Sequence, residues 1–320
     1  MNRILATLGS MALYATISIA AMAEEEPQVR LHRFEQHGKF GFRDERGSVV
    51  IQPTYDDADD FACGLAPVNR GARLDLTYHP PKRDGGRWGY INACGEVVIA
   101  LTLRWACEFS EGLAQVSDEK GRRFIDTQGT TVVTLGEVSH AGEFKEGLAP
   151  VHIDGSLQQQ DWQTRFIDKN GRTVFTADGY AEEFHEGLAL LCVIDRANPA
   201  NPRYGFIDRT GRVAIAPVFA EALCFSESLA PVRTKKTTVY GRGDTWGYID
   251  KTGKFVLEPT FNEAHPFRSG VARVHVGGAL RFDEVHSPPQ WEGGEWQLID
   301  RNGRVLKRSK EWVEYEVPAN

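Results

Sequence analysis

Two short signatures alternate along this chain from residue 40 to residue 303, and a fixed alternation constrains the fold more than any local propensity does. The first is an aromatic segment that ends in a turn, as in Trp246-Gly247-Tyr248-Ile249-Asp250 to Gly253. The second begins with Phe and leads into a Leu-Ala-x-Val segment, as from Phe109 to Val116. Each such Phe lies 13 to 15 residues after the preceding turn Gly, whereas the distance to the next aromatic segment varies widely. One interval is therefore fixed, and the other accepts insertions.

Local chemistry predicts strands and tight turns at both signatures. The first signature occupies residues 40–47, 88–95, 124–129, 166–171, 204–211, 246–253 and 296–303, and the second starts at Phe61, Phe109, Phe144, Phe184, Phe225 and Phe267. Asp followed three residues later by Gly indicates a type I turn that closes a hairpin. The segment after each turn is β-branched and apolar, as in Val97-Val98-Ile99, which favours a strand. We interpret the recurring aromatic residues as repeat core rather than as ligand contacts.

The order of these strands predicts an all-β tandem repeat of about seven three-stranded antiparallel meander units. Each unit groups a Leu-Ala strand, an aromatic strand and a β-branched strand, with Val29–Gln36 as the first strand and Val305–Lys307 as the last. A single small meander buries too little apolar surface to fold alone, so neighbouring units must pack on each other. The array can close into a propeller-like ring or extend as an open β-solenoid, and the sequence leaves both forms open.

The combined signatures resemble the WG repeat of bacterial proteins over about residues 38–306. The motif departs at Arg123 and Arg165, where we expect its Trp, at Gln297 in place of its Gly, and at Ser228 in place of the Gly of the fifth Leu-Ala signature. The resemblance implies a β-rich repeat array and no known chemistry. It therefore supports the predicted fold and adds little to the function.

The first residues predict export. Arg3, the apolar run Ile4–Ala21 and the small residues up to Ala23 are typical of a cleavable secretory signal, although an uncleaved anchor remains an alternative. We expect a periplasmic or secreted protein with no stable membrane insertion after signal removal. The predicted division is a signal peptide at 1–23, an N-terminal segment with the first strand at 24–37, the repeat array at 38–307 and a C-terminal tail at 308–320.

Composition argues against several classes of function. After signal removal the chain carries 36 Lys and Arg against 44 Asp and Glu, which is unsuited to general nucleic-acid binding. The five cysteines lack C-x-x-C pairs and the nine histidines lack metal spacing, so we expect no metal, no cofactor and no catalytic residues. A narrower hypothesis is that stacking brings Cys63 and Cys107 together as a disulfide.

A candidate binding face lies on the variable connections between the Leu-Ala strand and the next aromatic strand. These connections are residues 70–87, 154–164, 195–203, 233–245 and 277–295. In a regular stack they project from the same end, where insertions commonly form a functional surface. The candidate residues are Tyr78, Arg83, Trp162, Tyr240, Arg242 and Trp291. We expect a non-catalytic scaffold that binds a protein in the cell envelope, with a cell-wall or glycan partner as the alternative, unless these loops only close hairpins.

The linkers that precede each Leu-Ala strand are strongly acidic. Six such segments hold 17 acidic and 3 basic residues, whereas the five variable connections, with the flanking Arg165, hold 13 basic and 10 acidic residues. The cluster Asp56, Asp57, Asp59 and Asp60 lacks the ligand spacing and Gly of a calcium loop. We interpret these linkers as a solvated acidic flank rather than as cation sites.

Overall fold

The computed structural model describes residues 30–77, 82–136, 140–153, 162–194, 201–234, 245–281 and 290–311. These residues contain strands and turns but no helix, and therefore no apolar helix long enough to cross a bilayer. The expected signal peptide at 1–23 and the candidate residues Tyr78, Tyr240 and Arg242 lie outside the described residues.

The described strands form one three-stranded sheet, six four-stranded sheets and one two-stranded sheet. The three-stranded sheet contains β1 (His32–Gln36), β2 (Lys39–Arg43) and β3 (Val49–Tyr55). The six four-stranded sheets follow in chain order. The first two contain β4 (Asp57–Ala58), β5 (Leu65–Asp75), β6 (Lys82–Asn92) and β7 (Val97–Leu103), and then β8 (Trp105–Ala106), β9 (Leu113–Asp118), β10 (Gly121–Asp126) and β11 (Thr131–Thr134). The next two contain β12 (His140–Ala141), β13 (Leu148–Ile153), β14 (Gln163–Asp168) and β15 (Thr173–Asp178), and then β16 (Tyr180–His185), β17 (Leu188–Val193), β18 (Arg203–Asp208) and β19 (Val213–Phe219). The last two contain β20 (Glu221–Ala222), β21 (Ala230–Arg233), β22 (Trp246–Ile249) and β23 (Phe255–Phe261), and then β24 (Glu263–Ala264), β25 (Val271–Val276), β28 (Glu295–Asp300) and β29 (Val305–Ser309). The two-stranded sheet pairs β26 (Ala279–Arg281) with β27 (Gln290–Glu292).

The three-stranded unit predicted from the sequence is present, but six of the sheets carry a fourth strand. The acidic linker pairs with the Leu-Ala strand over a short stretch, as where Asp57 and Ala58 face Asn69 and Val68. The sequence signal for this strand is an Ala three residues before each second-signature Phe, and each such Ala is buried. A small side chain lets the linker lie flat against its neighbour, so the linkers are part of the sheets rather than loose connections.

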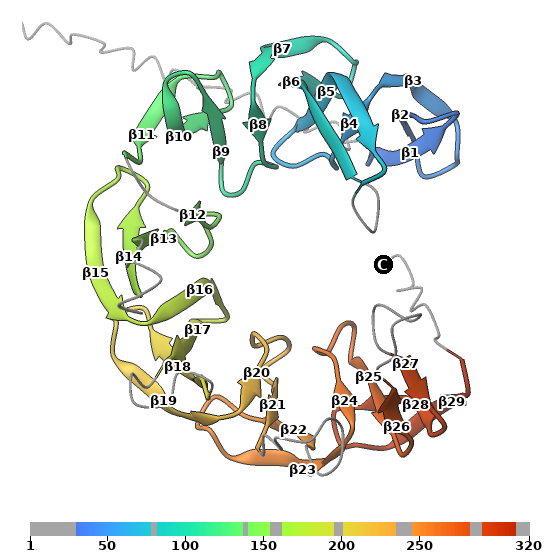
Figure 1. Cartoon of the computed structure of the whole chain (residues 1–320), viewed down its shortest axis with the longest axis vertical. Coiled ribbons are helices and arrows are strands. Elements are labelled where there is room, and N and C mark those ends of the chain that lie inside the picture. Colours follow the sequence, from blue (N-terminus) through green and yellow to red (C-terminus); the bar gives the residue numbers. More distant parts are fainter. Residues whose placement is uncertain are drawn as a thin grey trace, which may run out of the picture.

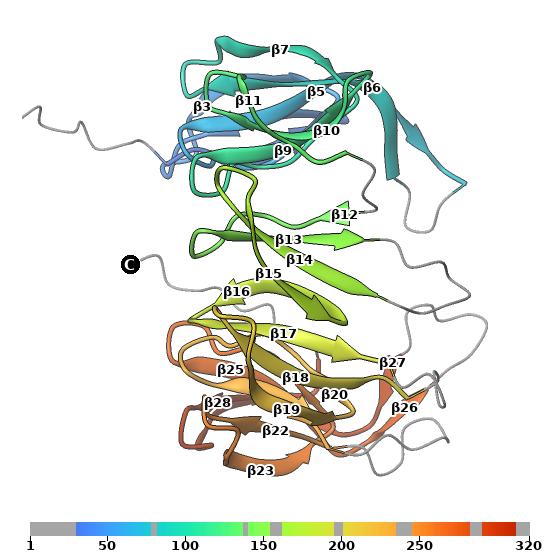
Figure 2. The same ribbon diagram turned by 90° about the vertical axis from the view of Figure 1, so that its left-hand side faces the viewer.

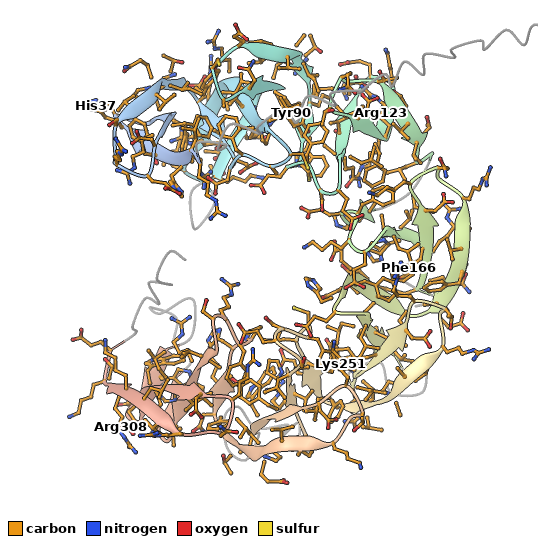
Figure 3. All side chains as sticks on the ribbon, turned by 180° about the vertical axis from the view of Figure 1, so that it is seen from behind. His37, Tyr90, Arg123, Phe166, Lys251 and Arg308 are labelled. Atoms are coloured by element: carbon orange, nitrogen blue, oxygen red, sulfur yellow. The ribbon has the colours of Figure 1, made fainter. Side chains whose placement is uncertain are left out.

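The sheets follow one another along an arc that does not close in the described residues (Figure 1). The first strands of these sheets, β8, β12, β16, β20 and β24, lie toward the inside of the arc, and the last strands β7, β11, β15, β19 and β23 lie toward its outside. The β5–β6 hairpin and the β26–β27 hairpin project from the same side of the arc (Figure 2). His37 and Arg308 mark its two ends, whereas Tyr90 and Phe166 lie within its body (Figure 3).

The hydrophobic core is divided into six clusters, and each cluster is shared by two successive sheets. An aromatic ring of one sheet packs against the second-signature Phe of the next at a centroid distance of 4.8 to 5.1 Å. These pairs are Phe42–Phe61, Tyr90–Phe109, Phe124–Phe144, Phe166–Phe184, Phe206–Phe225 and Tyr248–Phe267. Burying one such side chain stabilises the fold by about 1.5–3 kcal/mol, so each sheet depends on its neighbour.

The predicted turns have the expected geometry at every first signature. The backbone N–H of the last turn residue donates to the carbonyl of the first, as from Gly253 to Asp250 at 2.9 Å. The Asp250 side chain also accepts hydrogen bonds from the N–H groups of Thr252 and Lys254. A local side chain therefore holds each hairpin turn, which explains why the sequence alone located them.

Strand register corrects the alignment of two motif departures. Tyr90 and Phe124 occupy equivalent positions, so Arg123 replaces the Gly of the motif and not its Trp, and Arg165 does the same one sheet later. At Gly89 the partner strand shifts register, and a Cβ atom would lie 2.5 Å from the carbonyl oxygen of Ile99. The sheets with Arg123 and Arg165 pair without a shift at this position, so a side chain fits there.

The disulfide hypothesis is wrong in this structure, because Cys63 and Cys107 are both free thiols, as are the other three cysteines. Stacking brings equivalent repeat positions together. Cys63 follows its Phe by two residues and Cys107 precedes its Phe by two, so they occupy different positions of the repeat. Cys63 is exposed in a turn, whereas Cys107 is partly buried beside Tyr90, whose hydroxyl donates to the Cys107 carbonyl at 2.7 Å.

Candidate ligand-binding cleft

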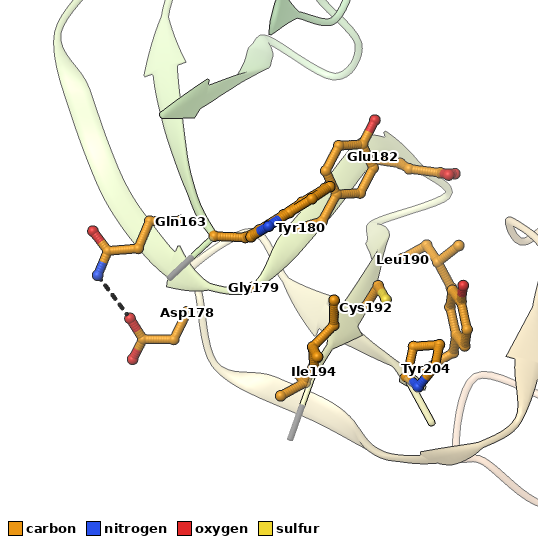
Figure 4. A pocket seen from close by; sticks show the side chains of 12 residues that line it. Gln163, Asp178, Gly179, Tyr180, Glu182, Leu190, Cys192, Ile194 and Tyr204 are labelled. Atoms are coloured by element: carbon orange, nitrogen blue, oxygen red, sulfur yellow. Dashed lines mark hydrogen bonds between the residues drawn. The ribbon is translucent and has the colours of Figure 1, made fainter. Parts of the chain in front are cut away.

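A cleft of about 830 Å³ opens where the sheet β12–β15 meets the sheet β16–β19 (Figure 4). It lies at the strand ends that lead into the variable connections. The first sheet contributes Trp162, Gln163, Asp178 and Gly179, and the second contributes Tyr180, Glu182, Leu190, Cys192, Val193, Ile194, Pro202 and Tyr204. Figure 4 shows Tyr180 and Tyr204 on opposite sides, with Leu190 and Cys192 between them.

A sharp corner in the backbone places Tyr180 at the mouth of the cleft. Gly179 has a φ of +133°, and a Cβ atom there would lie 2.5 Å from the carbonyl oxygen of Cys192. The buried Thr164 hydroxyl donates to the Gly179 carbonyl and accepts from the Ala181 N–H, both at 2.9 Å. Only Gly fits this conformation, and one buried hydroxyl holds both sides of the corner.

A row of rings supports Tyr180 from behind. The Tyr180 ring stacks on His152 at 4.2 Å, His152 stacks on His140 at 5.7 Å, and Trp162 meets Tyr180 edge-on at 5.7 Å. Burial lowers the pKa of His152 to about 4, with a smaller contribution from His140. The imidazole of His152 is therefore neutral at physiological pH and packs as an uncharged ring.

The cleft carries two carboxylates, and none of its described lining residues is Lys, Arg or His. Asp178 accepts a hydrogen bond from the Gln163 amide at 3.1 Å. Burial raises the pKa of Glu182, and the neighbouring Glu183 raises it further. Ionised carboxylates in partly buried surroundings attract positive charge more strongly than they do in bulk water.

The remaining polar groups of the cleft are held in their neutral forms. Burial raises the pKa of the Cys192 thiol, so little thiolate exists for nucleophilic attack. Burial is the largest cause that raises the pKa of Tyr204 to about 12, and the nearby Cys192 is the next. The described residues contain no group of three or more His, Cys, Asp or Glu side chains placed to hold a metal ion.

The three described candidate residues lie at separate places. Trp162 lines the cleft with 41% of its surface exposed. Arg83 forms an ion pair with Glu35 at 2.9 Å, which ties the β5–β6 hairpin to the first sheet. The Trp291 indole N–H donates to the Glu263 carboxylate at 2.7 Å, so this side chain ties the β26–β27 hairpin to the sheet that contains β24. The structure therefore brings one of the three to the cleft.

Sequence reasoning did not single out four residues that shape the cleft, namely Tyr180, Glu182, Cys192 and Tyr204. Tyr204 was interpreted as repeat core and Glu182 as part of an acidic linker. One signal was present, because the interval from Gly171 to Phe184 is 13 residues, the shortest in the chain. The shorter interval coincides with the corner at Gly179 and with a six-residue β16 where most other sheets have a two-residue strand.

Solved structures with similar folds share little sequence with the chain. A crystal structure of a eukaryotic initiation factor has a TM-score of 0.56 at 11% identity, over 88% of this chain and 74% of that one, which shows similarity of fold alone. An acylaminoacyl peptidase from Pyrococcus horikoshii has a TM-score of 0.45 at 11% identity, over 79% of this chain and 52% of that one. A puromycin hydrolase has a TM-score of 0.38 at 11% identity, over 89% and 52%. The chain thus spans about half the length of these two enzymes, and neither likeness supports an inference about it.

None of the curated proteins compared with the chain matches it in sequence. The family described as "WG containing repeat" does match, at residues 40–72, 88–120, 123–155, 204–236 and 246–278, which together exceed half of the chain. Each match starts near the middle strand of one sheet and runs into the Leu-Ala strand of the next, so it includes the contact between successive sheets. The chain belongs to the WG containing repeat family.

Proposed function

We propose that this protein is an exported, non-catalytic binding scaffold of the cell envelope, and that the cleft holds part of a polypeptide partner. One observation carries the proposal. Of the twelve lining residues, all but Tyr204 lie between the family matches that end at residue 155 and begin at residue 204. The cleft is thus formed where this chain departs from the general repeat, and such departures on a regular scaffold commonly provide function.

The chemistry of the cleft supports binding without catalysis. The Cys192 thiol has a raised pKa, and the Tyr204 hydroxyl has one of about 12, so neither is activated as a nucleophile or base. An exposed Trp next to a Tyr, with polar groups around them, is typical of residues that anchor a partner. We therefore assign Trp162 and Tyr180 the role of aromatic anchors.

We further propose that the array consists of seven repeat units in an open arc rather than a closed ring. The end sheets support this, since Arg43 stands at the position equivalent to the buried Ile91. At the other end, Lys307 stands at the position equivalent to Leu257. Polar outer faces are what terminal repeats need, and two cationic faces do not attract each other into a ring.

A cell-wall or glycan partner is the second candidate. The observation that favours it is the exposed indole of Trp162 beside Tyr180, because aromatic rings with an apolar body and a polar edge suit amphipathic ligands. This alternative predicts co-sedimentation of the protein with purified envelope polysaccharide, and loss of that co-sedimentation in Trp162→Ala.

The test of the proposed function is a pull-down from envelope extract with the purified chain as bait. We expect a specific polypeptide to be captured by the wild type and by Trp105→Ala, and to be lost with Trp162→Ala. Trp105 is a matched control because it is 38% exposed and lies on β8, outside the cleft. Capture that is the same for all three proteins would contradict a binding role for the cleft.

A further inference from the structure

We propose that the cleft binds a positively charged group, namely an Arg or Lys side chain of a partner polypeptide. This inference rests on the proposed binding function and names the chemistry of its ligand. It comes from comparing equivalent positions in successive sheets. Strand register identifies the equivalent positions, because the inner strand pairs with the Leu-Ala strand, and the Leu-Ala strand with the aromatic strand, in both sheets.

In the next two sheets the position equivalent to Cys192 holds a basic side chain. Arg233 pairs across the strands with Glu221 and Trp246, just as Cys192 pairs with Tyr180 and Tyr204. The Arg233 guanidinium forms an ion pair with Glu221 at 2.5 Å and lies 5.8 Å from the Trp246 ring centroid. The chain thus places its own cation between a carboxylate and an aromatic ring.

The last sheet repeats the arrangement with an imidazole. His275 pairs with Glu263 and with Trp296, and its ring lies 4.9 Å from the Trp296 ring. In the sheet β16–β19 the aromatic ring is present as Tyr204, and the basic residue is replaced by the short, uncharged Cys192. Tyr180 stands at the position of Glu221, and the carboxylate of the cleft comes from Glu182, two residues further along β16. At the position where the next sheet carries the Arg233 cation, the cleft has none.

The electrostatics of the cleft agree with this comparison. No described lining residue is basic, whereas Glu182 lies in the lining and Asp178 lies at its edge, bonded to Gln163. The raised pKa of Glu182 has burial and Glu183 as its causes, with no basic group among them. A guanidinium or ammonium group would be attracted by Glu182 and would contact the face of an aromatic ring. A space of about 830 Å³ also exceeds one side chain, so a short peptide segment fits.

The decisive probe is the peptide Ac-Gly-Arg-Gly-Arg-Gly-NH2, compared with the same peptide in which citrulline replaces each Arg. Citrulline keeps the shape and loses the charge. We expect calorimetry with the purified chain to show binding of the Arg peptide and about tenfold or greater weakening with citrulline, as loss of one charge-assisted contact predicts. Glu182→Gln should weaken binding of the Arg peptide by a similar factor.

The sharpest variant is Cys192→Arg, which places in the cleft the side chain that the next sheet carries at Arg233. We expect it to abolish binding of the Arg peptide, whereas Trp105→Ala, which lies outside the cleft, should bind normally. Circular dichroism of both variants confirms folding, and Glu182→Gln keeps the test valid if Cys192→Arg does not fold.

Several outcomes would overturn the inference. Equal binding of the Arg and citrulline peptides would show that charge is not recognised, although the binding function would stand. Binding of chitohexaose without binding of either peptide would favour a glycan. If neither peptide binds but the pull-down still depends on Trp162, the function survives and the cationic ligand does not.

Discussion

From the sheet β4–β7 onward, the junctions between successive sheets are of two kinds, which differ at one Glu. In the four junctions from β8–β11 onward, a Glu that precedes the Leu-Ala strand accepts a backbone N–H from the next sheet, as Glu146 does from Gly187 at 3.0 Å. A cation from the hairpin turn of that sheet also reaches the same turn, as Arg209 does at the Glu146 carbonyl. The four residues that form this Glu clamp are Glu111, Glu146, Glu186 and Glu227.

The junction between β4–β7 and β8–β11 lacks the Glu clamp. Cys63 stands in place of the Glu and Thr127 in place of the cation. The turn itself is unchanged, since Cys63 has a φ of 51° and Glu146 a φ of 53°. The aromatic pair Tyr90–Phe109 is also present there. The Glu is therefore not needed to form the turn, and its role is to link sheets that apolar packing already joins.

The largest expected effect tests whether apolar packing dominates both kinds of junction. Phe109→Ala at the unclamped junction and Phe184→Ala at a clamped one should each lower the free energy of unfolding by about 3–5 kcal/mol, because both rings are buried. Urea denaturation monitored by fluorescence measures this. If the Glu clamp were the main source of stability at its junction, Phe184→Ala would lower the free energy of unfolding clearly less than Phe109→Ala.

A smaller effect is expected from removing the clamp itself. Glu146→Ala should lower the free energy of unfolding by about 1–2 kcal/mol, because the Gly187 N–H loses a charged acceptor. The matched control is Cys63→Ala, which removes a side chain at the same turn position and should change the free energy by less than about 0.5 kcal/mol. Equal losses in the two variants would mean that the Glu contributes nothing beyond its turn.

Local elements of the fold could be predicted from the sequence, whereas contacts between distant segments could not. Hairpin turns such as Asp250 to Gly253 and the strands beside them depend on neighbours a few residues away, so the pattern predicted them. The fourth strand depends on pairing between a linker and a strand beyond it, and its buried Ala, as at Ala181, went unnoticed. Whether the array closes depends on the residues at both end faces, which no single repeat shows.

The cleft was less predictable for a related reason. Trp162 was found because it lies in a variable connection, but Cys192 is significant only when compared with Arg233 in the next sheet. The connections that follow these two residues differ in sequence and length, so spacing alone does not align the aromatic residues that face them. Strand register was needed to establish that the two positions are equivalent.

Installing a clamp at the unclamped junction should have a moderate, stabilising effect. The double variant Cys63→Glu with Thr127→Lys reproduces the pair formed by Glu111 and Lys169, whose side chains lie 3.1 Å apart. We expect a gain of about 0.5–1 kcal/mol in the free energy of unfolding, since the pair is partly exposed. Each single variant should gain less than the double variant. Additive or absent gains would show that the clamp does not act as a linked pair.

The smallest expected effect concerns the ionised Asp59 carboxylate near the same unclamped junction. Burial raises the pKa of Asp59 to about 6. The nearby Arg33 lowers this pKa, and the carboxylates of Asp57, Glu108 and Asp60 raise it. The folded pKa of this carboxyl exceeds its unfolded pKa of about 3.9, so the ionised form disfavours folding. The loss of folding free energy is therefore complete above pH 6 and disappears as the pH falls below about 4.

Asp59→Asn should therefore stabilise the protein at pH 8 by about 0.5 kcal/mol, a figure reduced because solvent screens this partly exposed carboxylate. The gain should shrink between pH 6 and pH 4, because the wild-type carboxyl becomes neutral in that window. Thermal denaturation of both proteins across this range measures it. A gain that is constant with pH would mean that Asn packs better than Asp, and that the ionised carboxylate does not weaken this junction.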